Sequence, residues 1–145
     1  MPPSNPLLAP IIALVIWTAV IWAWMYATRI PAIVRMRMRM DGNVPRGEQM
    51  ATLPARVRWK ADNYNHLMEQ PTQFYVTALV LVALGDQSGL SLAIAWIYVA
   101  LRVVHSLWQA LVNYIPVRFA LFSTSSLVLF ALVFRAAMQV FAVRY

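Results

Sequence analysis

Two runs of polar and ionisable residues interrupt apolar stretches of this 145-residue chain. Both have successive spacings of three, four and four positions: Asp62, Asn65, Glu69 and Gln73 in the first run, and Arg102, His105, Gln109 and Asn113 in the second. Residues at these spacings lie on one face of an α-helix. Each run therefore predicts a helix with a single polar stripe. Ionisable groups cost free energy inside a membrane, so those in the stripes are expected to have a structural or functional role.

The residue types in these stripes are consistent with three roles. Glu69 and Arg102 on neighbouring helices would form a buried ion pair, because each charge offsets the desolvation of the other. Alternatively, the two stripes line a polar pocket for a small zwitterionic or anionic ligand. A proton pathway is the third alternative, but it requires ionisable groups through the full membrane thickness. Arg135 is the one ionisable residue expected in the outer half of the predicted spans.

Several other kinds of chemistry have no support in the sequence. The chain has no cysteine, so it has no disulfide and no cysteine nucleophile. Its two histidines, without cysteine, do not make a zinc site, and no metal ligands are expected. There is also no glycine-rich phosphate loop and no nucleophile elbow. Any thiol chemistry would therefore depend on a thiol supplied by a co-substrate.

The elements that position these residues are predicted from composition and length. The chain is 61% hydrophobic and 12% charged, with a mean hydropathy of +0.62, which is far from the average soluble domain. Long apolar segments predict four transmembrane helices, at about 7–28, 64–84, 90–112 and 118–141. We therefore expect an all-α integral membrane protein, with residues 1–145 forming a single four-transmembrane-helix bundle.

The basic residues predict the orientation of this bundle. The net charge is +7, and eight of the twelve Lys and Arg residues lie between Arg29 and Lys60. The positive-inside rule places the loop 29–63 in the cytoplasm and both termini outside. The concentration of basic residues in one loop argues against nucleic-acid binding. Within it, the "RMRMRM" segment at 35–40 is interpreted either as interfacial anchors for anionic lipid or as a region that attracts an anionic substrate.

Two motifs resemble the MAPEG family, the membrane-associated proteins in eicosanoid and glutathione metabolism. The segment "ADNYNHLMEQPTQFY" at 61–75 is similar to the family's second-helix signature of an Asn, a Glu and then a Pro before an aromatic residue. The segment "RVVHSLWQALVNYIPVR" at 102–118 resembles the prostaglandin-synthase pattern of Arg, His, Pro and Arg. The resemblance covers about residues 10–142.

This resemblance implies a homotrimer in which neighbouring subunits hold glutathione, reached from the cytoplasmic side, as a co-substrate. Glu69 would receive the ammonium group of glutathione with Asn65 beside it, while Arg102 and His105 would shape the pocket. Arg118 would be catalytic, because a guanidinium near the sulfur favours the thiolate, which is the nucleophile. The second substrate would be a lipophilic electrophile or peroxide that enters from the membrane lipid.

The chain also departs from the family pattern. Asn65 precedes Glu69 by four positions where the family has three, and His66 occupies the expected place, so either residue is a candidate for the site. Gln109 stands where the prostaglandin-synthase pattern has a Tyr, and Phe119 and Phe122 replace a Ser and a Tyr.

The loss of these hydroxyls predicts generic transferase or peroxidase activity in place of the prostaglandin reaction. The "NYNHLMEQP" form resembles bacterial members of the family, which implies a bacterial inner membrane. The alternative is a non-catalytic lipid-binding or scaffold protein of the same fold, in which Arg102 and Glu69 have mainly structural roles.

Overall fold

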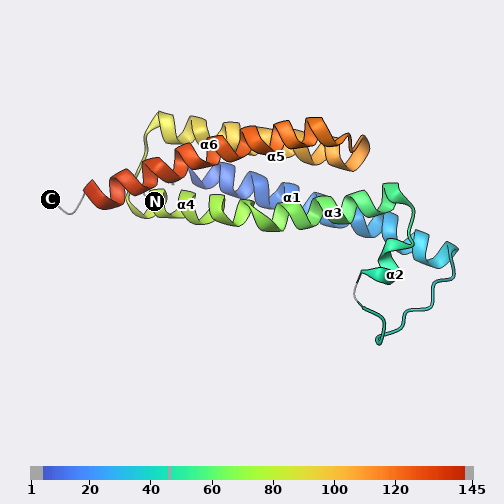
Figure 1. Ribbon diagram of the computed structural model, residues 1–145. Coiled ribbons are helices and arrows are strands. Elements are labelled where there is room, and N and C mark those ends of the chain that lie inside the picture. The colour runs from blue at the N-terminus through green and yellow to red at the C-terminus, as the bar shows by residue number, and fades with distance from the viewer. Residues whose placement is uncertain (1–4, 46, 143–145) are drawn as a thin grey trace.

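The computed structural model describes residues 5–45 and 47–142, and every regular element among them is a helix. The predicted domain 1–145 extends beyond this part of the chain at residues 1–4 and 143–145. The helices are α1 (Leu8–Arg35), α2 (Glu48–Ala51), α3 (Ala55–Glu69), α4 (Pro71–Ala83), α5 (Gly89–Leu111) and α6 (Ile115–Ala142). All except the short α2 run side by side in an elongated bundle (Figure 1).

Three of these helices, α1, α5 and α6, are long and apolar enough to cross a membrane. They carry many large apolar side chains on their outer surfaces, such as Ile16, Ile97 and Phe134, all more than half exposed. Such side chains are stable against lipid but unfavourable in water. The prediction of an all-helical membrane protein is therefore confirmed at this level.

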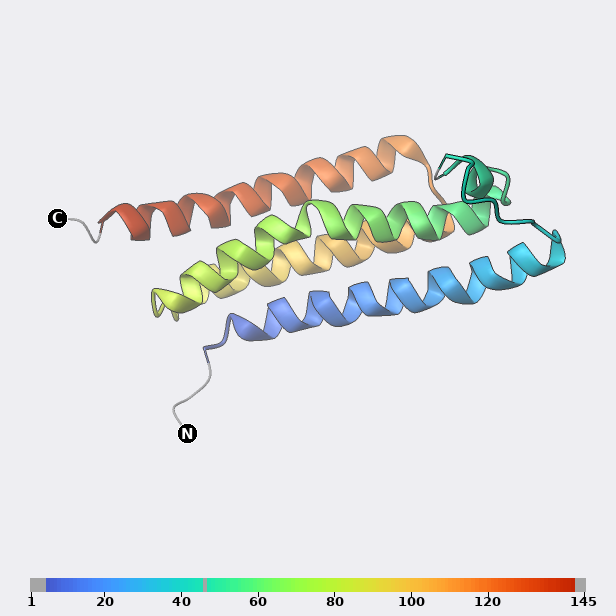
Figure 2. The ribbon, with the colours of Figure 1, turned by 90° about the horizontal axis from the view of Figure 1, so that it is seen from below.

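The predicted helix over 64–84 differs from the observed structure in both its start and its continuity. Helix α3 begins at Ala55, and α4 follows it after Gln70, so the two together form one bent rod (Figure 2). Pro71 has no N–H to donate to the carbonyl of Leu67, and its ring interferes with that carbonyl, which interrupts the helix. Gln70 keeps right-handed helical angles, with φ −63° and ψ −38°, so the chain continues in nearly the same direction.

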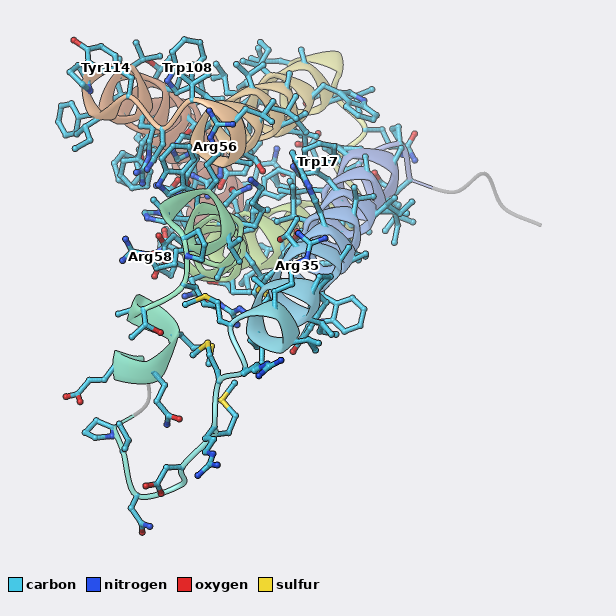
Figure 3. All side chains as sticks on the ribbon, turned by 90° about the vertical axis from the view of Figure 1, so that its right-hand side faces the viewer. Trp17, Arg35, Arg56, Arg58, Trp108 and Tyr114 are labelled. Atoms are coloured by element: carbon cyan, nitrogen blue, oxygen red, sulfur yellow. The ribbon has the colours of Figure 1, made fainter. Side chains whose placement is uncertain are left out.

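The basic loop is shorter than predicted, because α1 extends to Arg35 and α3 begins early. The helix ends inside the Arg-Met repeat, where Arg37 has a φ of 49°, a left-handed conformation that an α-helix does not continue through. The remaining segment, with α2, projects to the side of the bundle near the end of α1 (Figures 1 and 2). Arg35, Arg56 and Arg58 lie at this same end of α1 and α3 (Figure 3).

A hydrogen-bonded network at the opposite end holds the turn between α4 and α5 against α6. Asp86 accepts hydrogen bonds from the N–H of Ser88 at 2.8 Å, the hydroxyl of Ser91 at 2.5 Å and the amide of Gln139 at 3.0 Å. Arg135 donates to the hydroxyls of Ser91 at 2.9 Å and Ser88 at 3.0 Å. Arg135 therefore serves to join α6 to α5, and these hydrogen bonds account for its charge in this part of α6 without a proton pathway.

Candidate functional site

The polar stripe of α5 faces the interior of the bundle. Arg102, His105 and Gln109 are 1%, 2% and 0% exposed, and Asn113 is half-buried just beyond the end of the helix. Helix α5 packs against α1, α3 and α6, so this stripe is surrounded by neighbouring helices. The prediction of one shared face is confirmed for Arg102, His105 and Gln109, and the packing makes that face an internal one. It is wrong for Asn113, which follows the end of α5 in a left-handed conformation with a φ of 58°.

The polar stripe of α3 and α4 faces outward instead. All four of its residues are exposed: Asp62, Asn65, Glu69 and Gln73. The buried residues of this region, among them Asn63, Leu67 and Phe74, lie on another face. Within one chain, the two predicted stripes therefore do not face each other.

The first of the three alternatives, an ion pair between Glu69 and Arg102, is not formed within this chain. Arg102 donates one hydrogen bond to the carbonyl of His66 at 2.8 Å and a longer one to the amide oxygen of Gln70 at 3.5 Å. The Glu69 side chain is 69% exposed, and its Oε2 lies 3.9 Å from Nδ1 of His66. Arg102 is thus held by polar oxygens without a carboxylate, because the carboxylate of Glu69 points out of the bundle.

A cavity of about 300 Å³ brings several of the candidate residues together where α3, α5 and α6 meet. It is lined by His66, His105, Ile115, Arg118, Phe119 and Phe122. The rings of His66 and His105 are 6.1 Å apart between their centres. We call this space the His–Arg cavity. Its volume is at the lower end of the range for small-molecule sites.

The structure separates the two alternatives at the Asn position of the motif. His66 lines the His–Arg cavity. Asn65 is exposed and lines a different cavity, of about 670 Å³, which also contains Arg29 and Arg58. The two side chains therefore point to different spaces, although they are neighbours on α3. Within one subunit, His66 is therefore the candidate that lies beside Arg118.

Two residues beyond the predicted set complete the surroundings. The ring of Phe122 lies 6.2 Å from His105 and 6.5 Å from His66, and the guanidinium carbon of Arg102 is 6.0 Å from its centre. Gln70 accepts from Arg102 and donates to the hydroxyl of Ser126 at 2.6 Å. Gln70 lies within the recognised motif but outside the stripe spacing, which is why the pattern alone did not indicate its role.

Asn63 is a further buried residue that the stripe spacing missed. Its amide donates to both the carbonyl and the hydroxyl of Ser106, at 3.1 Å and 2.8 Å, and so ties α3 to α5. Asn63→Ala should lower the free energy of unfolding by about 1–3 kcal/mol, because buried acceptors lose their donor. Thermal unfolding in detergent is the measurement.

The control for this prediction is Asn65→Ala, two positions along the same helix. Asn65 is exposed and takes part in none of the observed side-chain hydrogen bonds, so its replacement should change stability by less than about 0.5 kcal/mol. Equal losses of stability in the two variants would contradict the structural role of Asn63.

An open groove of about 820 Å³ adjoins the His–Arg cavity along α4 and α6. Phe119 and Phe122 line both spaces. The groove continues past Leu127 to Phe130, and Glu69 lies at its other side. An amphipathic molecule can therefore lie along α6 with one end beside the His–Arg cavity.

These features define an all-helical membrane protein with a cationic side chain in its cavity, Arg118, and a second, Arg102, against the ring of Phe122. A family model gives a more particular identification. The MAPEG family model matches residues 7–138, which is nearly the whole chain, and the protein belongs to this family. No curated protein and no solved structure matched the chain.

Proposed function

We propose that this protein is a membrane-bound glutathione-dependent transferase or peroxidase that acts on a lipophilic electrophile. The observation that supports this most directly is the convergence of Arg118, His105 and His66 on one cavity. Membership of the MAPEG family supports the general class of activity.

The charges around the cavity suit an anionic thiol. Glutathione carries two carboxylates and an ammonium group, and the cavity region offers Arg118 and, behind Phe122, Arg102. Neither guanidinium forms an ion pair with a carboxylate among the residues that the structure describes. A permanently charged guanidinium near the sulfur lowers the thiol pKa and so raises the population of the nucleophilic thiolate. Arg118 is our candidate for this role.

The remaining contacts to glutathione are assigned by the same reasoning. His66 and His105 would hold the polar backbone of the tripeptide, and Glu69, next to His66, would receive the ammonium group. The amide of Gln109 is buried and has no hydrogen-bond partner among the described residues, so it is available as a second polar contact behind His105. Asn65 would contact glutathione only from the outer face of α3.

The lipophilic substrate would lie in the groove along α6. This groove is open to the side of the bundle and is lined by Phe119, Leu127 and Phe130. An apolar molecule could enter it from the membrane without crossing the polar end of the protein. Its electrophilic atom would then be attacked by the thiolate, with displacement of a leaving group. With a peroxide, the thiolate would attack one oxygen and break the O–O bond, which releases an alcohol and leaves a glutathione sulfenic acid that a second glutathione converts to the disulfide and water.

The outward stripe supports an assembly of several copies. Glu69 and Gln73 are exposed in a single chain, and at membrane depth such side chains are costly unless they are covered. A neighbouring subunit would cover them. We therefore propose a homotrimer, with α1, the α3–α4 rod, α5 and α6 as four membrane spans, and glutathione held between subunits.

The orientation follows from the basic end of the bundle. Arg35, Arg56 and Arg58 lie at the end from which the loop with α2 projects. This end would face the cytoplasm, and the membrane would be a bacterial inner membrane. Glutathione from the cytoplasm would then reach the cavity directly.

Purified protein in detergent tests the proposed function. With millimolar glutathione, it should conjugate a generic aryl halide or reduce an organic hydroperoxide, with saturation in glutathione. Binding should also raise the unfolding temperature, because a ligand at about 100 times its dissociation constant adds about 2.7 kcal/mol of apparent stability. A protein that glutathione neither stabilises nor activates would not be this enzyme.

One observation favours the alternative of a non-catalytic lipid-binding or scaffold protein. Phe119 and Phe122 give the cavity apolar walls in place of hydroxyl groups. Such walls suit an acyl chain as well as an electrophile. Under this alternative, phospholipid would raise the unfolding temperature and glutathione would have no effect.

A further inference from the structure

The short connection between α5 and α6 contains an asparagine in an unusual conformation. Asn113 has a φ of 58°, in the left-handed region that costs most residues energy but that Asn tolerates. Its backbone N–H donates to the carbonyl of Trp108 at 2.8 Å, which closes the end of α5. Its side chain is thereby directed to the start of the next helix.

The side chain of Asn113 holds the guanidinium of Arg118. Nη1 of Arg118 donates to Oδ1 of Asn113 at 2.5 Å. A guanidinium is planar and rigid, so one short hydrogen bond restricts the direction of the whole group. Nε of Arg118 is buried and has no acceptor among the described residues. The Nε and Nη2 edge is therefore left for a ligand.

We propose that Asn113 is a positioning residue, which orients Arg118 so that the free edge of its guanidinium meets the thiolate. This inference rests on the proposed glutathione chemistry and adds a residue to it. Asn113 does not line the His–Arg cavity, so it acts through Arg118. Without Asn113, the guanidinium keeps its charge but loses its fixed direction.

Asn113→Gly is the test variant, because it removes the side chain that holds Arg118 and glycine adopts a positive φ without strain. We expect kcat for glutathione conjugation to fall about ten-fold, with little change in KM for glutathione. An interaction that matters mainly in the transition state lowers kcat and kcat/KM together. In an Arg118→Ala background, Asn113→Gly should have no further effect, because the two residues act as one unit.

Asn113→Asp retains an acceptor for Arg118 and tolerates the same backbone conformation. We expect it to restore most of the lost turnover. Its carboxylate would offset part of the guanidinium charge, so the rise of activity with pH should move to higher pH. The other titratable side chains that line the cavity are His66 and His105, and neither is altered in this variant.

The matched control is Asn43→Gly, since Asn43 lies in the exposed loop and bonds only to Asp41 nearby. It should keep wild-type turnover. Unchanged turnover in Asn113→Gly, or the same ten-fold loss in the Arg118→Ala background, would overturn the inference while the glutathione function stands.

Two further outcomes are also decisive. If Asn113→Gly does not fold, Asn113→Ala and Asn113→Asp are compared at equal folded fraction, and equal turnover of this pair overturns the inference. If the wild-type protein shows no glutathione-dependent activity, the proposed function is wrong, and so is the positioning role of Asn113.

Discussion

Replacing Arg118 by Ala should lower kcat/KM for glutathione conjugation by about 100- to 1000-fold. This is the range expected when one preorganised donor that stabilises developing or resident negative charge is removed from a catalytic site. The rise of activity with pH should also shift upward, since the thiol would lose the cation that favours its anion. Steady-state kinetics across pH measures both effects.

The effect is expected to be large because the cavity has no second group to replace Arg118. Phe119, Phe122 and Ile115 give the cavity apolar walls, and His66 and His105 are the remaining polar side chains of the lining. Arg102 is separated from the cavity by Phe122, against whose ring it lies. A single guanidinium therefore carries most of the proposed thiolate stabilisation.

Arg118→Lys is the matched variant for this prediction. It keeps the charge but loses the planar donor geometry and the bond to Asn113, so we expect an intermediate loss. Thermal unfolding should show that all variants fold equally. Wild-type kinetics in Arg118→Ala would show that the thiolate is stabilised elsewhere, and would remove the role proposed for this residue.

Replacing Asp86 by Ala should lower the free energy of unfolding by about 3 kcal/mol. Asp86 is only 8% exposed and accepts from Ser88, Ser91 and Gln139. Hydrogen bonds to a charged acceptor contribute about 1.5–3 kcal/mol, and buried donors left without a partner add to the cost. The loss should be visible as a lower unfolding temperature in detergent.

The control is Asp41→Ala, because Asp41 lies in the exposed loop and its carboxylate bonds only to Asn43. This variant should unfold at nearly the wild-type temperature. Glutathione turnover should be unaffected by Asp86→Ala at temperatures where the protein is folded, since Asp86 lies at the opposite end of the bundle from the His–Arg cavity. Equal stability of the Asp86 and Asp41 variants would contradict the proposed network.

The carboxylate of Asp86 also predicts that the folded protein loses stability in acid. Burial raises the pKa of Asp86, but hydrogen bonds from Ser91, Ser88 and Gln139 outweigh it and bring the pKa to about 2, from an ordinary value of 3.8. A carboxyl with a lowered pKa stabilises the fold fully above its unfolded value and loses this contribution as the pH falls towards the folded value. Wild-type stability should therefore decrease between about pH 4 and pH 2, and Asp86→Ala should flatten this decrease.

The sequence by itself determined the class of the protein and the residues that share a face of α5. Long apolar segments make a membrane protein because lipid is where such surface is stable, whatever the arrangement of the helices. The spacing of Arg102, His105 and Gln109 places them on one helix face, since helical geometry is local. The motifs at 61–75 and 102–118 together also indicated the MAPEG family, which the family model confirms.

Only the tertiary structure decided which way each face points. Helix α3 buries Asn63 and Leu67, and this packing turns Glu69 out of the bundle and leaves Arg102 with oxygens of His66 and Gln70. The bond between Asn63 and Ser106 joins residues 43 positions apart, and no local pattern specifies such a pair.

The hydrogen bonds of Arg135 are likewise specified by no local pattern, because its hydroxyl partners lie on α5 and in the turn before it. Helical periodicity relates residues within one turn or two. The rotation of one helix against another is set by which contacts between distant segments bury the most apolar surface and satisfy the most polar groups, and these contacts exist only once the chain has folded.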